Sequence, residues 1–187
     1  MLSKAVTHDL LWDSAALEAV DESQQWIVSA MQRHGHELVT MLWRILGNDQ
    51  DVCDAYQTTF LHLAHQEGGC KPRRLKPYLF RTASNAAISM LRRRLAERKM
   101  LSNMTGTTEA PTDLGRDFDT RHLTENLRSC LAELPAHLRD VIMLRDLGEL
   151  SYREVARSLG ISVGTARVYR CKAIQLLAAW MKTEEEK

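Results

Sequence analysis

Residues 134–177 constrain the fold more than any other part of this 187-residue chain, because they carry the signals of a helix-turn-helix in order. Ser151 opens a Ser-x-x-Glu capping box, and Gly160 suits the left-handed position that ends a helix. Ser162 is suited to cap a second helix, which we expect from Val163 to about Trp180. Two short helices joined by such a turn form a unit that reads a DNA groove.

The second of these helices has polar and basic residues near its start, where a recognition helix presents side chains to base edges and phosphates. These residues are Thr165, Arg167, Arg170 and Lys172. Gly164 leaves room for close approach of the backbone to DNA. The alternative is a helical hairpin whose arginines form a solvated face.

The net charge of +1 hides a strong segregation of charge along the chain. Residues 1–70 have a net charge of −7, whereas residues 71–100 have ten basic residues against Glu97, a net charge of +9. Residues 101–127 return to −3, and residues 128–182 reach +4. Two basic blocks separated by an acidic one indicate two DNA contacts joined by a segment that avoids DNA.

Helical periodicity runs through the rest of the chain and predicts an all-α fold of two helical domains joined by a flexible linker. We expect helices at Trp26–Gly47, from Asp51 to about Gln66, and from Tyr78 to about Met100, with a basic loop from Gly69 to Pro77. A further helix is expected to begin at Pro135. The predicted divisions are an N-terminal extension (1–25), a first helical domain (26–100), an acidic flexible linker (101–122), a second helical domain (123–182) and an acidic tail (183–187).

Composition argues against several other classes of protein. No apolar run approaches the roughly 20 residues of a membrane span, and the N-terminus lacks the apolar core of a signal peptide, so we expect a cytoplasmic protein without membrane insertion. The four cysteines, Cys53, Cys70, Cys130 and Cys171, form no CxxC pair and are expected to be reduced thiols. We find no catalytic constellation and expect no enzyme activity, no metal and no cofactor.

Three segments together resemble an extracytoplasmic-function sigma factor of the sigma-70 family. The pattern LPxxxRxVxxLRxLxxLSYxEVAxxLGISVGT, from Leu134 to Thr165, is similar to the fourth sigma region. LGNDQDVCDAYQTTF (46–60) and YLFRTASNAAISMLRRR (78–94) are similar to the second region. The resemblance covers roughly Val28 to Leu177 and implies that the two domains are sigma regions 2 and 4.

The resemblance implies one protein surface and one DNA surface in the first domain. Asp51, Asp54, Gln57 and Phe60 would face the clamp helices of the polymerase β′ subunit, although Phe60 alone is equally well explained by core packing. The basic segment 71–99 would recognise and open the minus-ten promoter element. Its implied DNA-binding residues are Lys76, Tyr78, Arg81, Asn85, Arg92, Arg93 and Arg94, with Tyr78 or Phe80 as a stacking partner or as core.

In the second domain, the resemblance implies that the recognition helix enters the major groove of the minus-thirty-five element. Arg167 would make a base or shape contact, and Arg153, Arg170 and Lys172 would bind phosphates, beside Ser162, Gly164 and Thr165. Family members usually have an aliphatic, inward-facing residue where Arg170 stands, so either the helix is rotated or Tyr169 faces inward. The implied partners are core RNA polymerase (β′ clamp helices and β flap), promoter DNA and an anti-sigma factor, and the acidic linker would thread the polymerase cleft.

Other classes of protein use some of the same features. A free-standing regulator would use the helix-turn-helix as a dimer on a two-fold site, without a second basic domain. A redox or metal sensor would account for the cysteines. A resolvase-like or transposase accessory enzyme would need paired acids or a serine nucleophile, which are absent in recognisable spacing. None of these accounts for both halves of the chain.

Overall fold

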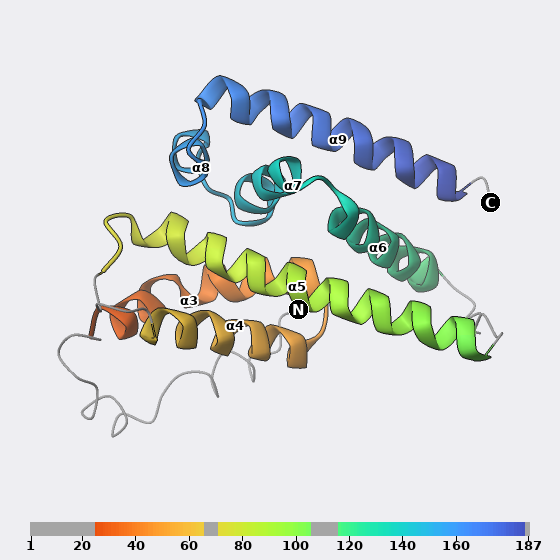
Figure 1. Ribbon diagram of the computed structural model, residues 1–187, viewed down its shortest axis with the longest axis horizontal. Helices are drawn as coiled ribbons and strands as arrows, with labels where there is room; N and C mark the ends of the chain where they lie inside the picture. Colours follow the sequence, from red (N-terminus) through yellow and green to blue (C-terminus); the bar gives the residue numbers. More distant parts are fainter. Residues whose placement is uncertain (1–24, 66–70, 106–115, 186–187) are drawn as a thin grey trace. The chain divides into compact units, whose positions relative to one another are not determined.

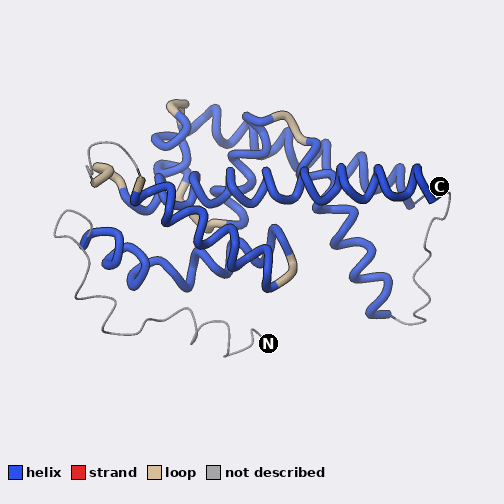
Figure 2. The backbone as a smooth tube through the Cα atoms, turned by 60° about the horizontal axis from the view of Figure 1, so that its bottom comes forward, coloured by secondary structure: helices blue, strands red, loops and turns tan. Residues whose placement is uncertain are grey.

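The computed structural model describes residues 25–65, 71–105 and 116–185, and every regular element within these ranges is a helix (Figure 1). Figure 2 shows the same helices without a strand among the described residues, so the predicted all-α class is confirmed. The chain packs as two compact units, one ending at Ala87 and the other beginning at Ile88. The elements are α3 (Gln25–Leu46), α4 (Asp49–Ala64), α5 (Leu75–Thr105), α6 (Arg116–Glu133), α7 (Ala136–Ile142), the π-helix η2 (Met143–Leu147), α8 (Tyr152–Leu159) and α9 (Val163–Glu185).

In the first unit, α3 and α4 pack against each other and the start of α5 lies alongside them (Figure 1). Gly47, with φ of 73°, follows the end of α3. Asn48 begins α4, because its side chain accepts a hydrogen bond from the backbone N–H of Asp51 at 2.8 Å. Apolar side chains from all three helices are completely buried and form one core: Leu38, Leu42, Ile45, Val52, Ala55, Leu79, Phe80 and Ala83.

The helix-turn-helix of the second unit has the predicted structure at each signal. The Ser151 side chain accepts from the backbone N–H of Glu154, and the Glu154 carboxylate accepts from the backbone N–H of Ser151 at 2.8 Å. Gly160 is left-handed, with φ of 69°. The Ser162 hydroxyl then accepts from the backbone N–H of Thr165 at 2.9 Å and caps α9. The capping box, the turn glycine and the second cap are therefore confirmed.

The segment before α8 differs from the single helix expected there. α7 begins after Pro135, as predicted, but the chain then widens into η2, in which the N–H of Gly148 donates to the carbonyl of Met143 at 2.9 Å. Glu149 follows in the left-handed region, with φ of 56°. π-Helices are rare, and those that do occur are often at functional sites. This one lies directly before α8, the first helix of the helix-turn-helix.

The predicted linker is partly helical at its two ends. α5 continues to Thr105 and α6 begins at Arg116, so both helices extend into the segment predicted as linker. The remaining linker residues, 106–115, lie outside the described residues, as do residues 1–24 of the predicted N-terminal extension and residues 186–187 of the predicted tail. α9 also runs past the expected end at Trp180. The helices therefore extend into the segments predicted as linker and tail, and the predicted bounds of the domains stay predictions.

The left-handed conformation of Gly160 leads to a prediction about the stability of the protein. Replacing Gly160 with alanine is expected to destabilise the protein by about 1 kcal/mol, because a left-handed backbone is unfavourable for a residue with a Cβ. An added Cβ would meet no atom within 4 Å, so the effect would come from the backbone alone. Denaturant unfolding measures it, and Gly164→Ala, within α9, is the matched control that should not destabilise. Equal effects of the two substitutions would contradict this explanation.

The burial of Tyr56 leads to a prediction about how stability depends on pH. Its side chain is buried between α4 and α3, where a Cβ built on Gly35 would lie 3.0 Å from the Tyr56 hydroxyl. Burial raises the pKa of Tyr56 from 10.0 to about 12. The folded protein keeps a proton that the unfolded chain loses, so stability should fall as the pH rises between these values. An absorbance titration of phenolate should show one late tyrosine that Tyr56→Phe removes, and its absence would contradict the burial of the hydroxyl.

Candidate nucleic-acid interface

The start of α9 has the exposure expected of a groove-reading surface. Arg167 and Lys172 are exposed, and so is Arg153 on α8. Gly164 is exposed as well, and a Cβ added there would meet only the Ser162 hydroxyl, at 3.6 Å. Ser162 itself is engaged in capping and lies 2.8 Å from the Thr165 hydroxyl. The backbone around Gly164 is therefore accessible to a phosphate group, and the exposed Arg167 follows it within one helical turn.

Arg170 has a different role from the predicted phosphate contact. Its Nε lies 2.9 Å from both carboxylate oxygens of Asp146 in η2, and its Nη2 lies 2.7 Å from one of them. This hydrogen bonding raises the pKa of Arg170 further. A guanidinium held by a carboxylate in this way positions two elements relative to each other. Arg170 therefore joins α9 to η2, and its implied phosphate contact stays a prediction.

Tyr169 and Arg170 are both half-buried, which resolves the question of which residue faces inward. The Tyr169 ring packs edge-on against His137 of α7, with ring centroids 4.9 Å apart. Ala166 and Ala173 of α9 are completely buried, and they lie on the side of the helix between Tyr169 and Arg170. α9 therefore contacts α7 through an aromatic side chain and η2 through a salt bridge.

On α4, the predicted protein-binding residues divide into exposed and internal ones. Asp54 and Gln57 are exposed, one helical turn apart. Asp51 is engaged in the N-cap, since its carboxylate accepts from the Asn48 side chain at 2.7 Å. Phe60 is only 5% exposed and packs on the Tyr56 ring at 4.8 Å between centroids. Phe60 therefore packs in the core, which is one of the two alternatives open from sequence, and its implied contact with the polymerase stays a prediction.

Sequence reasoning missed the apolar residue of this face. Leu61 is 57% exposed and lies one turn beyond Gln57, on the same side of α4 as Asp54. Protein interfaces typically place an apolar anchor among polar residues that set register. Its position four residues after Gln57 was a signal in the sequence, but the neighbouring phenylalanine offered a larger apolar side chain. We define Asp54, Gln57 and Leu61 as the α4 face.

On α5, Arg81 and Asn85 are exposed and four residues apart, so they lie on one side of the helix. Tyr78, half-exposed, lies one turn before Arg81 on the same side. Phe80 is completely buried, and Lys76 is occupied by Glu37 of α3 at 2.7 Å. Among the predicted minus-ten residues, the structure therefore brings Tyr78, Arg81 and Asn85 together.

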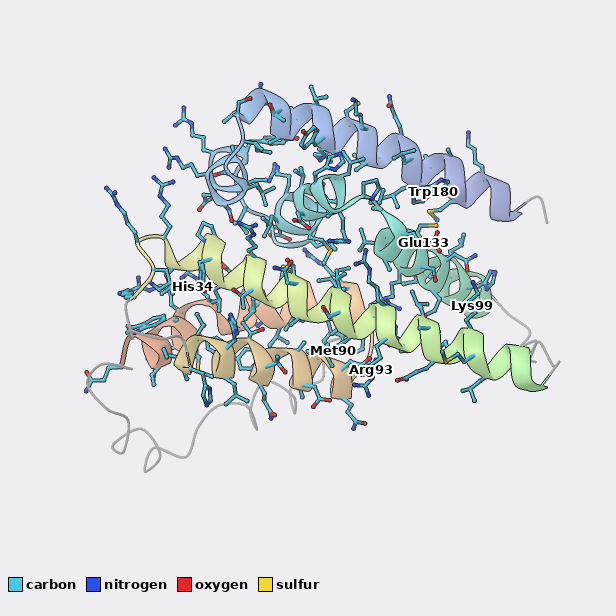
Figure 3. All side chains as sticks on the ribbon, in the orientation of Figure 1. His34, Met90, Arg93, Lys99, Glu133 and Trp180 are labelled. Atoms are coloured by element: carbon cyan, nitrogen blue, oxygen red, sulfur yellow. The ribbon has the colours of Figure 1, made fainter. Side chains whose placement is uncertain are left out.

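The arginine-rich end of α5 contacts α6 within the second unit. Arg92 donates two hydrogen bonds, at 3.1 and 2.8 Å, to the carbonyl of Ala132. Arg93 pairs with Glu97 at 2.9 Å. Figure 3 labels Arg93 and Lys99, which project from this part of α5, and Glu133, the last residue of α6. Arg92 therefore caps the end of α6, where sequence reasoning had placed a phosphate contact.

Three arginine side chains lie around the carboxylate of Glu125 in α6. Arg98 and Arg128 donate to its carboxylate at 3.0 and 2.9 Å, and Arg94 lies 3.8 Å away. Burial raises the pKa of Glu125, but the hydrogen bonds from Arg98 and Arg128 outweigh it and leave the pKa below its usual value. Glu125 is therefore a carboxylate at neutral pH. Arg94, like Arg92, therefore has a partner on α6, and the phosphate contacts implied for both stay predictions.

Possible metal ligands and cysteines lie apart from one another among the described residues. No group of three His, Cys, Asp or Glu side chains within these ranges is placed to hold a metal ion. Cys53, Cys130 and Cys171 are free thiols, and Cys70 lies outside the described residues. None of the helices in the described part of the chain is long and apolar enough to cross a membrane.

Fold and site together define an all-helical DNA-binding protein, in which a helix-turn-helix unit follows a unit with an exposed polar helix face. Family models match in the same order: sigma-70 region 2 over residues 30–96 and sigma-70 region 4 over residues 124–177. The chain belongs to the sigma-70 family, among its extracytoplasmic-function members. The matched ranges fall within the predicted domains, whose bounds remain predictions.

Curated relatives agree with this family. The chain is 26% identical over 162 residues to the sigma factor SigE of Mycolicibacterium smegmatis, a match that covers 85% of this chain and 60% of SigE. It is 27% identical over 146 residues to the ferric citrate uptake sigma factor FecI of Escherichia coli, covering 76% of this chain and 83% of FecI. The matched part thus spans less than two thirds of SigE.

A solved structure supports the fold. The chain is similar to CnrH, whose structure was determined in complex with the cytosolic domain of CnrY. The TM-score is 0.56 at 22% sequence identity, and the match covers 91% of this chain and 94% of the other. At this identity the similarity is one of helical architecture.

Proposed function

We propose that this chain binds core RNA polymerase through the α4 face and directs it to promoters through α5 and the helix-turn-helix. The observation that carries the proposal is the exposure of Asp54 and Gln57 in the unit matched by sigma-70 region 2, with Leu61 beside them as an apolar anchor. In this proposal, RNA synthesis belongs to the polymerase and the chain supplies the binding surfaces. Its place of action is then the bacterial cytoplasm.

The first test is complex formation with core polymerase that lacks its own initiation subunit. Size-exclusion chromatography of the full chain with this enzyme should give a stoichiometric complex. Transcription from genomic fragments would then identify the promoters. A folded, monomeric chain that stays separate from the polymerase would favour a free-standing regulator, which uses its helix-turn-helix without a polymerase-binding face.

For the upstream promoter element, we propose that α9 enters the major groove and that Arg167 contacts a base. Arg167→Ala is expected to cost about 1–3 kcal/mol of discrimination at one base position, as for a bidentate arginine contact. Binding of the polymerase complex to duplexes with single base changes measures this. Lys172→Ala is the control, because a phosphate contact would weaken binding to all sequences alike. Unaltered base preference in Arg167→Ala would remove Arg167 from this role.

For the minus-ten element, we propose Tyr78, Arg81 and Asn85 as the surface that captures unpaired bases. An aromatic ring, a cation and an amide supply stacking, phosphate neutralisation and hydrogen bonds to base edges. Their common side of α5 supports the proposal. Arg92 and Arg94 take no part in it while they bind α6.

Control by an anti-sigma factor is the remaining part of the proposal. A protein that covers the α4 face would prevent polymerase binding, because an interface residue cannot serve two partners at once. The family resemblance supports such a partner. Addition of the partner to the polymerase complex should release the chain, with the α4 face protected from hydrogen exchange.

A further inference from the structure

The Tyr152 ring has guanidinium groups placed over it. Tyr152 is the first residue of α8, and the guanidinium carbons of Arg145 and Arg167 lie 4.9 and 5.5 Å from its ring centroid. Both distances are within the range of a cation–π contact. Arg145 comes from η2 and Arg167 from α9, so one aromatic ring connects the π-helix with the recognition helix.

Two other arginines also contact Tyr152, Arg145 with its guanidinium over the ring and Arg170 through a hydrogen bond with the side chain, and each has a further partner. Arg145 donates to the carbonyl of Leu150 at 3.0 Å, and Arg170 is held by Asp146. Arg167 is exposed, and the Tyr152 ring is the contact that the structure records for it. Of these guanidinium groups, that of Arg167 is therefore the one available to a groove.

The π-helix accounts for how this ring is held. Consecutive residues of η2 serve two different elements, because Arg145 reaches the Tyr152 ring and Asp146 reaches Arg170. These two contacts fix the ring and α9 against the same five-residue turn. The position of the ring relative to the start of α9 is then determined before DNA binds.

We propose that Tyr152 is a positioning residue that sets upstream-element selectivity by holding the Arg167 guanidinium in a groove-reading orientation. A free arginine side chain loses rotamer entropy when it binds, and a guanidinium already stacked on a ring loses less. The inference rests on the proposed function, since it assigns a supporting residue to the promoter contact of Arg167. Tyr152 acts through Arg167 and need not touch a base.

The test is a double-mutant cycle on the polymerase complex of the full chain. The probe is the duplex enriched by the wild-type complex from a random DNA pool, compared with a duplex changed at the base that Arg167→Ala ceases to discriminate. Tyr152→Leu should reduce this discrimination about two- to fivefold, the equivalent of one exposed cation–π contact. Tyr152→Phe keeps the ring and removes only the hydroxyl's contact with Arg170, which Asp146 still holds, so discrimination should stay at the wild-type level.

The decisive result is coupling between the two residues. In the Arg167→Ala background, Tyr152→Leu should cause no further loss of discrimination. Equal loss in both backgrounds, or the same loss in Tyr152→Phe as in Tyr152→Leu, would overturn the proposal. So would an Arg167→Ala chain that discriminates like the wild type. Thermal unfolding and polymerase binding of each variant separate these results from misfolding and from failure of the proposed function, which would appear as absence of the complex.

Discussion

Replacing Asp54 with arginine is expected to abolish the complex with core RNA polymerase. Asp54 is exposed on the α4 face, next to the polar Gln57 and the apolar Leu61. Reversing a charge within an interface removes an attraction and introduces a repulsion in its place. For an interface residue of this kind we expect a loss of at least about 2 kcal/mol, or roughly 30-fold in affinity. Fluorescence-detected titration of the chain with core polymerase would measure it.

Gln32 provides the control for this substitution. It is exposed on α3 in the same unit, so Gln32→Arg introduces the same side chain away from the α4 face. Binding should survive Gln32→Arg and should weaken in Gln57→Arg, which makes the identical replacement on the α4 face. If Asp54→Arg bound polymerase like the wild type, the α4 face would be the wrong surface. A loss of DNA binding in parallel would indicate misfolding instead.

Phe80→Ala is expected to destabilise the first unit by about 3–5 kcal/mol, the usual effect of removing a buried aromatic ring. The Phe80 side chain is completely buried, and Lys76 lies 5.5 Å from the centroid of its ring. Since a domain is stable by only about 5–15 kcal/mol, this loss is a large fraction of the total. Urea unfolding followed by circular dichroism would measure it.

The same experiment distinguishes a core role from a stacking role on DNA. Tyr78, two residues earlier and half-exposed, is the matched position. Tyr78→Ala should cost much less stability than Phe80→Ala and should reduce the capture of unpaired bases, where base–aromatic stacking is worth about 1–3 kcal/mol. A stable Phe80→Ala chain that fails to open promoters would mean that the ring leaves the core to bind DNA.

Local signals allowed the helix-turn-helix to be predicted almost completely from sequence. Ser151, Gly160 and Ser162 act within four residues of themselves, through caps and a left-handed turn, so their effect does not depend on the rest of the fold. The break between α3 and α4 was predictable for the same reason, since Gly47 and Asn48 separate them, whereas α5 begins at Leu75, within the segment predicted as a basic loop.

Contacts between distant residues were not predictable in this way. The sequence shows that Arg92 and Arg170 are basic, but it does not show that Ala132 and Asp146 lie beside them. Their partners are 40 and 24 residues away in the chain, beyond the reach of periodicity or capping rules. A basic run therefore predicts positive charge, while tertiary structure decides which of its members remain accessible.

Burial also separated neighbours that looked alike. Phe60 and Leu61 are adjacent apolar residues, and helical geometry turns one into the core and the other to the surface. Tyr152 begins α8, and its ring lies under two guanidinium groups. An aromatic residue can pack in the core or bind a cation, and for Tyr152 the positions of η2 and α9 decide between these roles.

The contacts of α5 with α6 occupy part of the positive charge of α5. Residues 71–100 have a net charge of +9, but Arg92 neutralises a helix end and Arg98 neutralises a carboxylate of the protein itself. On duplex DNA, the logarithm of the affinity falls with the logarithm of the salt concentration, and each phosphate neutralised by a side chain makes this slope steeper by about 0.9. Arginines that stay on Glu125 and Ala132 release no counterions from DNA. Promoter binding by this chain should therefore tolerate rising ionic strength better than its sequence charge implies.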